Sequence, residues 1–251
     1  MHMTTQALVL REVAYKESDK LLTLLTADRG RLTVSARGAR KKQDAAAAAC
    51  QSLVWGEFTL WEYRGRWTVK EAFTLRRFHG MLASLEKLAL GTYFAEVAEA
   101  LSEEEVPDAA LLSLTLNSLH ALDKLSKPLP LVKAAFEGRA MSIAGYEPLL
   151  ERCALCGKET PEAPMLNLSS GLLHCAHCRD GAGDGISMPL DAPSLSAARH
   201  IVWGEAKRLF SFSLEPGSLA LLSGACEAFL MTQLERGFHT LDFYKQVCAD
   251  R

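Results

Sequence analysis

Apolar and polar positions in the first third of the chain follow the two-residue period of β-strands. Residues 21–26 (LLTLLT) are apolar and β-branched, and residues 31–36 (RLTVSA) alternate polar with apolar side chains after a turn at Asp28-Arg29-Gly30. A second hairpin is expected around Arg64-Gly65. The predicted strands are residues 7–11, 21–26, 31–36, 53–63 and 66–73. Four or five strands in about 75 residues predict a small barrel or sandwich.

From Met81 onward, apolar positions recur every three or four residues, which predicts amphipathic helices. Asp108 is a suitable N-cap for the second helix, and Gly145 closes the third. The predicted helices are residues 81–101, 109–122, 131–144, 195–203 and 219–236. We expect an α+β, multidomain chain with a β domain over residues 1–79 and a helical domain over residues 80–251. An insertion at residues 150–182 breaks the helical pattern.

Composition and charge narrow the class of protein. No apolar run approaches the roughly 20 residues that cross a bilayer, and the first residues lack the order of a secretory signal, so we expect a cytoplasmic protein. Residues 1–80 hold 14 Lys and Arg against 8 Asp and Glu, a net charge of +6, whereas residues 81–251 hold 14 against 22, a net charge of −8. This asymmetry predicts a basic module that contacts phosphates, attached to an acidic body.

Four of the seven cysteines form two CxxC pairs, Cys153 with Cys156 and Cys175 with Cys178, and 18 residues lie between the pairs. Two residues between thiolates let both sulfurs reach one ion at about 2.3 Å. The intervening segment predicts a hairpin that returns the second pair to the first. Four thiolates leave no open coordination position, so we expect one structural Zn²⁺ in a zinc-ribbon layout.

Other interpretations of these cysteines stay open. The thiols can be buried as small hydrophobic groups, or they can form a redox or disulfide pair, although an odd total of seven fits a reducing compartment better. His174 and His177 flank the second pair, and either can replace a thiolate as a ligand.

Residues 37–42 (RGARKK) put four positive charges within six positions, directly after a predicted strand. Such side chains contact phosphates through counterion release and carry no base specificity. The candidate DNA-binding residues are Arg37, Arg40, Lys41, Lys42, Arg11, Lys16 and Arg31, with Lys20 and Arg29 as further members if the first strands lie side by side. The alternative is a solvated charged loop.

Aromatic residues are concentrated in the second predicted hairpin, at Trp55, Phe58, Trp61, Tyr63 and Trp67. Nucleobases stack on exposed rings at roughly 1–3 kcal/mol per base. Aromatic residues that alternate on a strand more commonly fill the core of a small barrel. We therefore favour a core position for Phe58 and for whichever of Trp55 and Trp61 points inward.

The motifs of common enzyme chemistry are absent. The chain has no GxxxxGK[ST] loop, no GxSxG elbow, no HExxH and no GxGxxG after a predicted strand. Residues 103–105 (EEE) are expected to be a solvated helix end. We therefore predict a protein that is not an enzyme, with no catalytic residue and no small-molecule substrate.

The order of these motifs resembles the RecO family of DNA repair proteins. The N-terminal resemblance is carried by residues 7–10 (ALVL), the LLTLLT run and residues 36–41 (ARGARK). The middle is carried by Phe136-Glu137 and residues 144–149 (AGYEPL), which lead into the first CxxC pair, and the end by residues 241–244 (LDFY). The resemblance spans nearly the whole chain, and the last motif is weak by itself.

This resemblance implies an N-terminal OB-fold β-barrel and a C-terminal α-helical domain with a four-cysteine zinc-ribbon insertion. It also implies a recombination mediator that binds single- and double-stranded DNA and anneals complementary strands. With RecR, such a protein helps to load RecA onto DNA coated by single-strand-binding protein. The implied setting is DNA recombination and repair of DNA damage at the bacterial nucleoid.

The family also binds the acidic, apolar C-terminal tail of single-strand-binding protein on its helical domain. Lys133 and Arg139 are the candidates for the basic rim of that surface, with ordinary surface charges as the alternative. Two features depart from the family pattern. Residues 52–55 (SLVW) stand where a Pro-Phe is usual, and Gly138-Arg139 interrupts a helix that is normally rich in leucine.

The rival function is a zinc-containing adaptor that binds other proteins and makes no direct contact with DNA. Salt-titrated binding of an oligonucleotide distinguishes the two, because an adaptor shows no steep dependence on salt. A third possibility, an enzyme that acts on nucleic acid, requires clustered carboxylates or an open metal site, and neither is visible in the sequence.

Overall fold

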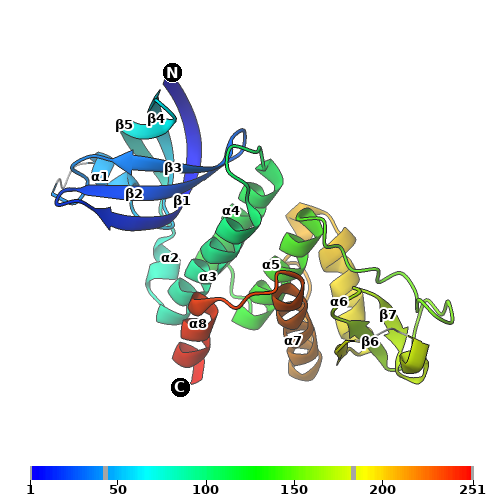
Figure 1. Cartoon of the computed structure of the whole chain (residues 1–251). Coiled ribbons are helices and arrows are strands. Elements are labelled where there is room, and N and C mark those ends of the chain that lie inside the picture. Colours follow the sequence, from blue (N-terminus) through cyan, green and yellow to red (C-terminus); the bar gives the residue numbers. More distant parts are fainter. Residues whose placement is uncertain (1, 42–44, 182–184, 250–251) are drawn as a thin grey trace. The chain divides into compact units, whose positions relative to one another are not determined.

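The computed structural model describes residues 2–41, 45–181 and 185–249. The chain forms two compact units, which we call unit 1 (Met1–Leu125 and Phe238–Arg251) and unit 2 (Ser126–Gly237). Figure 1 follows the chain from the blue barrel strands to the red helix α8. Unit 1 contains the barrel and several helices, so its bounds differ from the expected division into residues 1–79 and 80–251. That division stays a prediction.

Unit 1 begins with a closed barrel in the strand order β1-β2-β3-β5-β4 (Figure 1). The strands are β1 (His2–Tyr15), β2 (Asp19–Thr26), β3 (Gly30–Ala36), β4 (Trp55–Tyr63) and β5 (Arg66–Arg76). β3 and β5 pair in parallel and the other neighbours are antiparallel. The long β1 pairs first with β4 and then with β2, and its register with β2 shifts between Val9 and Arg11. This five-stranded closure confirms the predicted OB-fold barrel.

The barrel core follows from the alternation of side chains along each strand. In β4, the even-numbered Gly56, Phe58 and Leu60 are buried, so the core position predicted for Phe58 is confirmed. Trp55 and Trp61 share the opposite, odd-numbered face and are only half-buried, so neither points inward. The core residues include Ala7, Val9, Leu22, Leu24, Leu32, Val34, Phe58, Leu60 and Trp67.

The helices of unit 1 follow the barrel and return at the end of the chain. They are α1 (Ala45–Ala49), α2 (His79–Leu82), α3 (Leu85–Leu101), α4 (Ala109–Lys124) and α8 (His239–Ala249). The single helix expected from residue 81 is divided, because the Ser84 hydroxyl accepts the Lys87 N–H and caps α3. Asp108 caps α4, as predicted. Tyr93 of α3 contacts Phe238 edge to face, just before α8.

A short segment after α3 holds the start of β3. The Arg31 N–H donates to the Glu103 carbonyl, and the Glu105 N–H donates to the Arg31 carbonyl, both at 3.1 Å. The carboxylates of residues 103–105 are exposed as expected, but the segment is not a free helix end because its backbone pairs with the barrel. Gly30 has a φ of +55°, and a Cβ added there would lie 1.8 Å from the Val106 carbonyl oxygen.

The described residues of unit 2 form three α-helices and a small sheet in the order β7-β6-β8. Its elements are α5 (Leu129–Ile143), β6 (Pro164–Asn167), β7 (Leu173–Cys175), the 3₁₀ helix η1 (Ala176–Gly181), β8 (Ser187–Pro189), α6 (Ala192–Trp203), the 3₁₀ helix η2 (Ala206–Arg208) and α7 (Pro216–Gln233). The hairpin of β6 and β7 is confirmed, and the three-residue β8 was too short for its pattern to predict.

Gly138 does not interrupt α5, contrary to the expectation from the family pattern. The helix continues through it, and a Cβ at this position would lie 2.8 Å from the Ile201 Cγ2 of α6. The glycine therefore permits the close packing of α5 against α6. Among the residues that the structure describes, no helix combines the length and the apolar character needed to cross a membrane.

We predict that Gly30→Ala lowers the free energy of unfolding by about 3 kcal/mol or more, because it adds both a strained left-handed residue and a collision with backbone. Gly65→Ala is the matched control: Gly65 has a φ of +72°, but nothing lies within 4 Å of an added Cβ. The control should cost only about 1 kcal/mol. Urea denaturation of both variants measures the difference, and equal losses would contradict the close approach at Gly30.

Candidate metal centre and nucleic-acid interface

The basic loop, residues 37–41, docks onto the turn that joins β1 to β2. The Gly38 N–H donates to the Asp19 carboxylate at 2.9 Å, and the Arg40 N–H donates to the Ser18 carbonyl at 3.0 Å. The Arg40 guanidinium donates to the Lys16 carbonyl at 2.8 Å. Two loops that are distant in sequence therefore form one structure at this end of the barrel.

Asp19 is the electrostatic centre of this contact. The Gly38 N–H donates to its carboxylate and lowers its pKa, the nearby Ser18 hydroxyl acts in the same direction, and partial burial opposes them. The positive charges of Lys16 and Arg37 lower the pKa further. The carboxylate is therefore ionised at neutral pH and offsets part of the repulsion among the surrounding cations.

The docked loops bring part of the predicted basic set together. Lys16, Arg37, Arg40 and Lys41 are all exposed to solvent, so their charges are available to an anionic ligand. Lys42 lies outside the described residues. The sequence shows the basic run at residues 37–42 directly. The hydrogen bond that holds Lys16 beside this loop becomes visible only in the fold.

Arg11, Arg31 and Lys20 of the predicted basic set have partners elsewhere on unit 1. Arg11 forms a two-point ion pair with Glu99 of α3, with its Nη2 at 2.7 Å, and this pair raises the pKa of the guanidinium. Arg31 donates to the Glu99 carbonyl at 2.8 Å. Lys20 pairs with Glu12, and Arg29 is half-buried after β2. Arg11 and Arg31 thus hold the barrel to α3, away from the docked loops.

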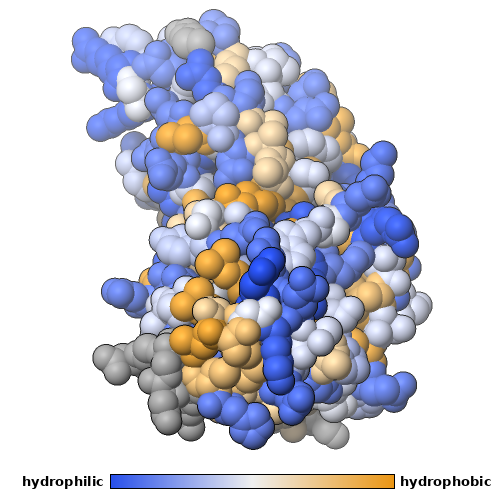
Figure 2. Space-filling model, turned by 90° about the vertical axis from the view of Figure 1, so that its right-hand side faces the viewer, coloured by the Kyte–Doolittle hydropathy of each residue, from blue (hydrophilic) through white to orange (hydrophobic). Residues whose placement is uncertain are grey.

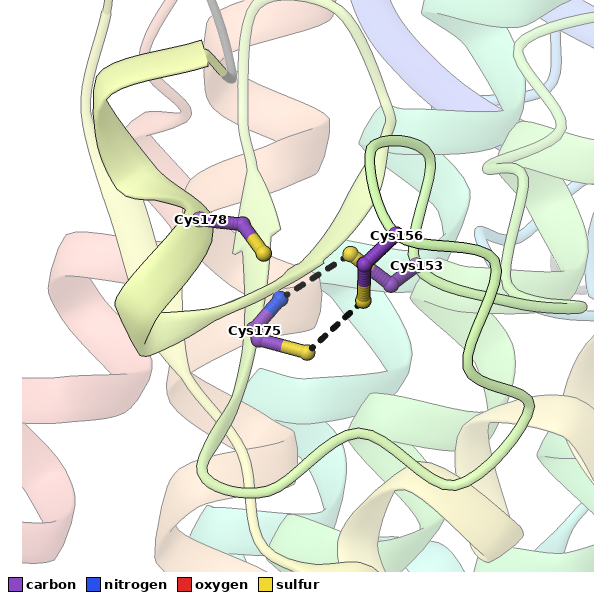
Figure 3. A group of neighbouring side chains, drawn as sticks. All are labelled: Cys153, Cys156, Cys175 and Cys178. Atoms are coloured by element: carbon purple, nitrogen blue, oxygen red, sulfur yellow. Dashed lines mark hydrogen bonds between the residues drawn. The ribbon is translucent and has the colours of Figure 1, made fainter.

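The cysteines come from two separate segments of unit 2. Cys153 and Cys156 lie in the loop after α5, Cys175 ends β7, and Cys178 lies in η1. Figure 3 shows the four side chains directed toward a common centre. Their sulfurs all lie within 4.8 Å of one another, and the Cys156 and Cys175 sulfurs are 3.6 Å apart.

This geometry fits a tetrahedral ion. Four sulfurs at about 2.3 Å from one centre lie about 3.8 Å apart, and the Cys156 and Cys175 sulfurs, 3.6 Å apart, are close to this separation. The Cys175 N–H donates to the Cys153 sulfur at 3.4 Å, and Gly157, with a φ of +73°, turns the first loop back. Such N–H contacts stabilise metal-bound thiolates. The arrangement can therefore hold a metal ion, with four protein ligands and no open position.

The thiols differ in their tendency to ionise. Burial raises the pKa of Cys153, but N–H groups of Cys156, Leu155 and Cys175 donate to its sulfur and bring the pKa down to about 6. Burial and the neighbouring Cys156 and Cys153 sulfurs raise the pKa of Cys175 to about 12. One thiolate thus suppresses ionisation of the others, so full ionisation of the set requires a cation.

Neither flanking histidine belongs to the cluster, among the residues whose placement is described. His174 is fully buried, and its ring nitrogens lie 2.9 Å from the Cys175 carbonyl and 2.9 Å from the Ser187 hydroxyl. These contacts direct its ring away from the sulfurs. The ligand set that the geometry favours is therefore four cysteines, without histidine.

Arg199 of α6 anchors the first cysteine loop, and the sequence analysis missed it. Its guanidinium donates to three backbone carbonyls, those of Leu150 at 2.8 Å, Glu151 at 2.9 Å and Glu159 at 2.6 Å. These carbonyls bracket the first CxxC pair. No sequence motif marks such a residue, because an arginine that binds backbone carbonyls needs no particular partner side chain.

Family models match both parts of the chain. Residues 1–78 match the model described as recombination protein O N terminal, and residues 82–242 match recombination protein O C terminal. This chain belongs to the RecO family.

Curated relatives within the RecO family cover nearly all of the chain. It is 28% identical over 246 residues to the DNA repair protein RecO of Acetivibrio thermocellus, which covers 97% of this chain and 96% of the relative. It is 25% identical over 248 residues to that of Alkaliphilus metalliredigens, at 98% and 100% coverage. The protein of Desulforudis audaxviator is 35% identical over 176 residues, 70% of each chain. Membership of the RecO family supports a role in DNA repair and recombination.

Lys133 does not lie where the resemblance to the RecO family led us to expect it. Its side chain is nearly fully buried, and its ammonium lies 2.9 Å from carboxylate oxygens of both Glu137 and Glu227. Burial lowers its pKa, but the two negative charges outweigh burial and raise the pKa above its ordinary value. A basic rim needs an exposed charge, whereas this charge is neutralised between α5 and α7.

Arg139, the other expected rim residue of this RecO-family chain, is half-buried. Its guanidinium donates to the Gly204 carbonyl at 2.5 Å, and burial lowers its pKa against the opposing charge of Glu147. Glu147 also accepts the indole N–H of Trp203 at 3.0 Å.

Figure 2 shows apolar side chains gathered into patches on one face of the molecule. Exposed large hydrophobic residues of unit 2 are Tyr146, Leu149, Leu155, Ile186 and Trp203.

We predict that Arg199→Met weakens metal retention about tenfold, because groups that orient metal ligands typically contribute that much affinity. Lys158→Met is the matched control, since Lys158 lies in the same loop with a 58% exposed side chain. Competition with a chelator measures the affinity of each variant. If Arg199→Met and Lys158→Met retain metal equally, Arg199 does not position the loop.

Proposed function

We propose that this chain is a non-catalytic, DNA-binding recombination mediator. In this proposal it binds single- and double-stranded DNA and anneals complementary strands. With RecR, it helps to load RecA onto DNA coated by single-strand-binding protein. Membership of the RecO family supports the mediator role, and the chemistry of the barrel supports contact with DNA.

The observation that carries the proposal is the docking of residues 37–41 on the β1–β2 turn. It gathers Lys16, Arg37, Arg40 and Lys41 at one end of the barrel, with their charges in solvent. Cations grouped in this way bind phosphates by releasing condensed counterions, without reading bases. Such binding suits a protein that must act on any damaged sequence.

Annealing follows from the same electrostatics. Two complementary strands repel each other, and a cationic surface that holds both lowers this repulsion. We assign Arg11 and Arg31 a supporting role, since their ion pair and hydrogen bond with Glu99 fix the barrel on α3. We also propose that residues 1–79 are the DNA-binding domain and that residues 80–251, with the insertion at 150–182, bind protein partners.

Unit 2 is the proposed site for the C-terminal tail of single-strand-binding protein. Arg139 remains the basic candidate, with Trp203 as its exposed apolar neighbour. We propose that Cys153, Cys156, Cys175 and Cys178 hold one Zn²⁺. Because four thiolates fill its coordination, the ion stabilises the loop and the small sheet and supplies no reactive position.

We predict that Arg37→Glu combined with Lys41→Glu weakens binding to every DNA sequence and lowers the slope of log affinity against log salt by about 2, or about 1 per lost phosphate contact. The side chain of Arg40 is left intact because it holds the two loops together. Fluorescence anisotropy of a labelled oligonucleotide at several salt concentrations gives the slope.

The control for this experiment is Lys158→Glu combined with Lys207→Glu, which makes the same change of charge at exposed positions of unit 2. It should leave the slope unchanged. A wild-type protein without a steep salt dependence would instead favour the adaptor, and identical slopes in the two double variants would remove the basic loop from the interface.

We also predict that the purified protein contains about one equivalent of zinc, and that removing it lowers the melting temperature. Cys156→Ser should abolish stoichiometric binding, because it removes one of the four sulfurs. Cys248→Ser is the matched control, since Cys248 is also an exposed cysteine but lies in α8, outside the cluster. Elemental analysis decides the matter, and metal-free protein with unchanged stability would rule out a structural zinc.

A further inference from the structure

An outward-facing row of aromatic rings lies near the hairpin of β4 and β5. Trp61 and Tyr63 stack with their ring centroids 5.8 Å apart and their planes 25° from parallel. His2, opposite Trp61 on β1, extends the row at 6.2 Å. Tyr63 is 55% exposed. These rings stand outside the barrel because their positions alternate with the buried Phe58 and Leu60.

Cations lie over these rings. The Lys70 ammonium lies 4.5 Å from the Trp61 ring centroid, and the Arg64 guanidinium lies 5.1 Å from the Tyr63 ring centroid. Arg66, the cross-strand partner of Tyr63, is also exposed. Three cations and two outward rings therefore share one end of the hairpin. Two acidic residues lie further along the strands: Glu71 is opposite Thr59, and Glu57 is opposite Phe73.

The turn holds this group in a fixed conformation. Arg64 and Gly65 have φ values of +52° and +72°, the combination of a two-residue type I′ turn. The Gly65 N–H donates to the Glu62 carboxylate at 2.6 Å, which closes the turn. Asparagine or glycine is favoured at the first position of such a turn, and an arginine there costs free energy. Despite this cost, the arginine at this position places a cation directly beside Tyr63.

Rings beside cations match single-stranded nucleic acid better than they match a protein partner. A single strand offers flat bases with free faces and phosphates about one nucleotide apart, so one ligand uses both kinds of side chain. Duplex DNA does not offer its base faces, because they are already stacked. A purely apolar partner would leave Lys70, Arg64 and Arg66 without a counter-charge.

We propose that Trp61 and Tyr63 form a stacking site for nucleobases of single-stranded DNA, with Lys70, Arg64 and Arg66 contacting the adjacent phosphates. The proposal rests on the DNA-binding function proposed above and adds a site that distinguishes single strands from duplex. In the bound state the Lys70 and Arg64 side chains move from the rings to phosphates, and bases take their places. His2 is a neighbour of the site and not a required part of it.

The test uses the full chain and three labelled probes: an oligothymidine, an abasic strand of equal length, and a duplex of equal length. Trp61→Thr combined with Tyr63→Thr removes the rings and keeps good strand formers. We expect affinity for oligothymidine to fall about tenfold for each base that loses its stacking partner. Affinity for the abasic strand and for the duplex should stay at the wild-type value.

Two further variants separate stacking from folding. Trp61→Phe combined with Tyr63→Phe keeps flat rings and should restore most of the preference for oligothymidine over the abasic strand. Phe73→Thr is the matched control: Phe73 is also 55% exposed and lies on β5, opposite Glu57. It should leave binding to all three probes unchanged.

The outcomes distinguish this site from the basic loop. Arg37→Glu with Lys41→Glu should weaken binding to all three probes, whereas loss of the rings should affect oligothymidine alone. If the double threonine variant binds oligothymidine like the wild type, or weakens all probes equally, the stacking site is wrong while the basic loop stands. If the wild type binds none of the probes, both proposals fail.

Discussion

The hydrogen bond between the Gly38 N–H and the Asp19 carboxylate fixes the basic end of the barrel, on which the proposed contact with DNA depends. A loop with three positive charges in five residues repels itself and would extend into water without partners. Asp19 supplies the opposing charge, and backbone carbonyls accept the donors of Arg40. One carboxylate and two carbonyls thus hold the cations together while leaving their charges exposed. A cationic surface that is organised before binding loses less entropy when it meets phosphates.

In unit 2, unlike the basic loop, charged groups are held inside the fold at two sites. Lys133 is buried between Glu137 and Glu227, where its positive charge is paired with two carboxylates and joins α5 to α7. At the cysteine cluster, one thiolate raises the pKa of its neighbours, so only a bound cation allows all four sulfurs to ionise. At these two sites of unit 2, charged groups therefore contact one another within the fold, whereas the cations of the basic loop lie in solvent.

The two proposed contacts on the barrel act on different parts of DNA. The basic loop binds phosphates, which single strands and duplexes share, and so supports the holding of two strands during annealing. The row formed by Trp61 and Tyr63 binds bases, which only a single strand presents with free faces. Once annealing has stacked the bases into a duplex, this second contact is lost, so the product is held less tightly than the substrate. A mediator with both contacts thus has a physical reason to release annealed DNA.

The sequence by itself determined the barrel strands, most of the long helices, the N-cap at Asp108, the basic run at 37–42 and the grouping of the cysteines, but not α1, α2, β8 or α8. These features depend on residues that are close in sequence. The period of apolar residues indicates which face of a helix or strand is buried, and the spacing of a CxxC pair lets two sulfurs bind one ion. Only the tertiary structure decided which distant residues contact one another and which side chains are buried. Arg11 meets Glu99 across 88 residues, Lys133 is buried, and Trp61 faces outward because the register of β4 puts Phe58 inside. A sequence pattern shows that a face is covered, but which residues cover it depends on contacts between distant segments.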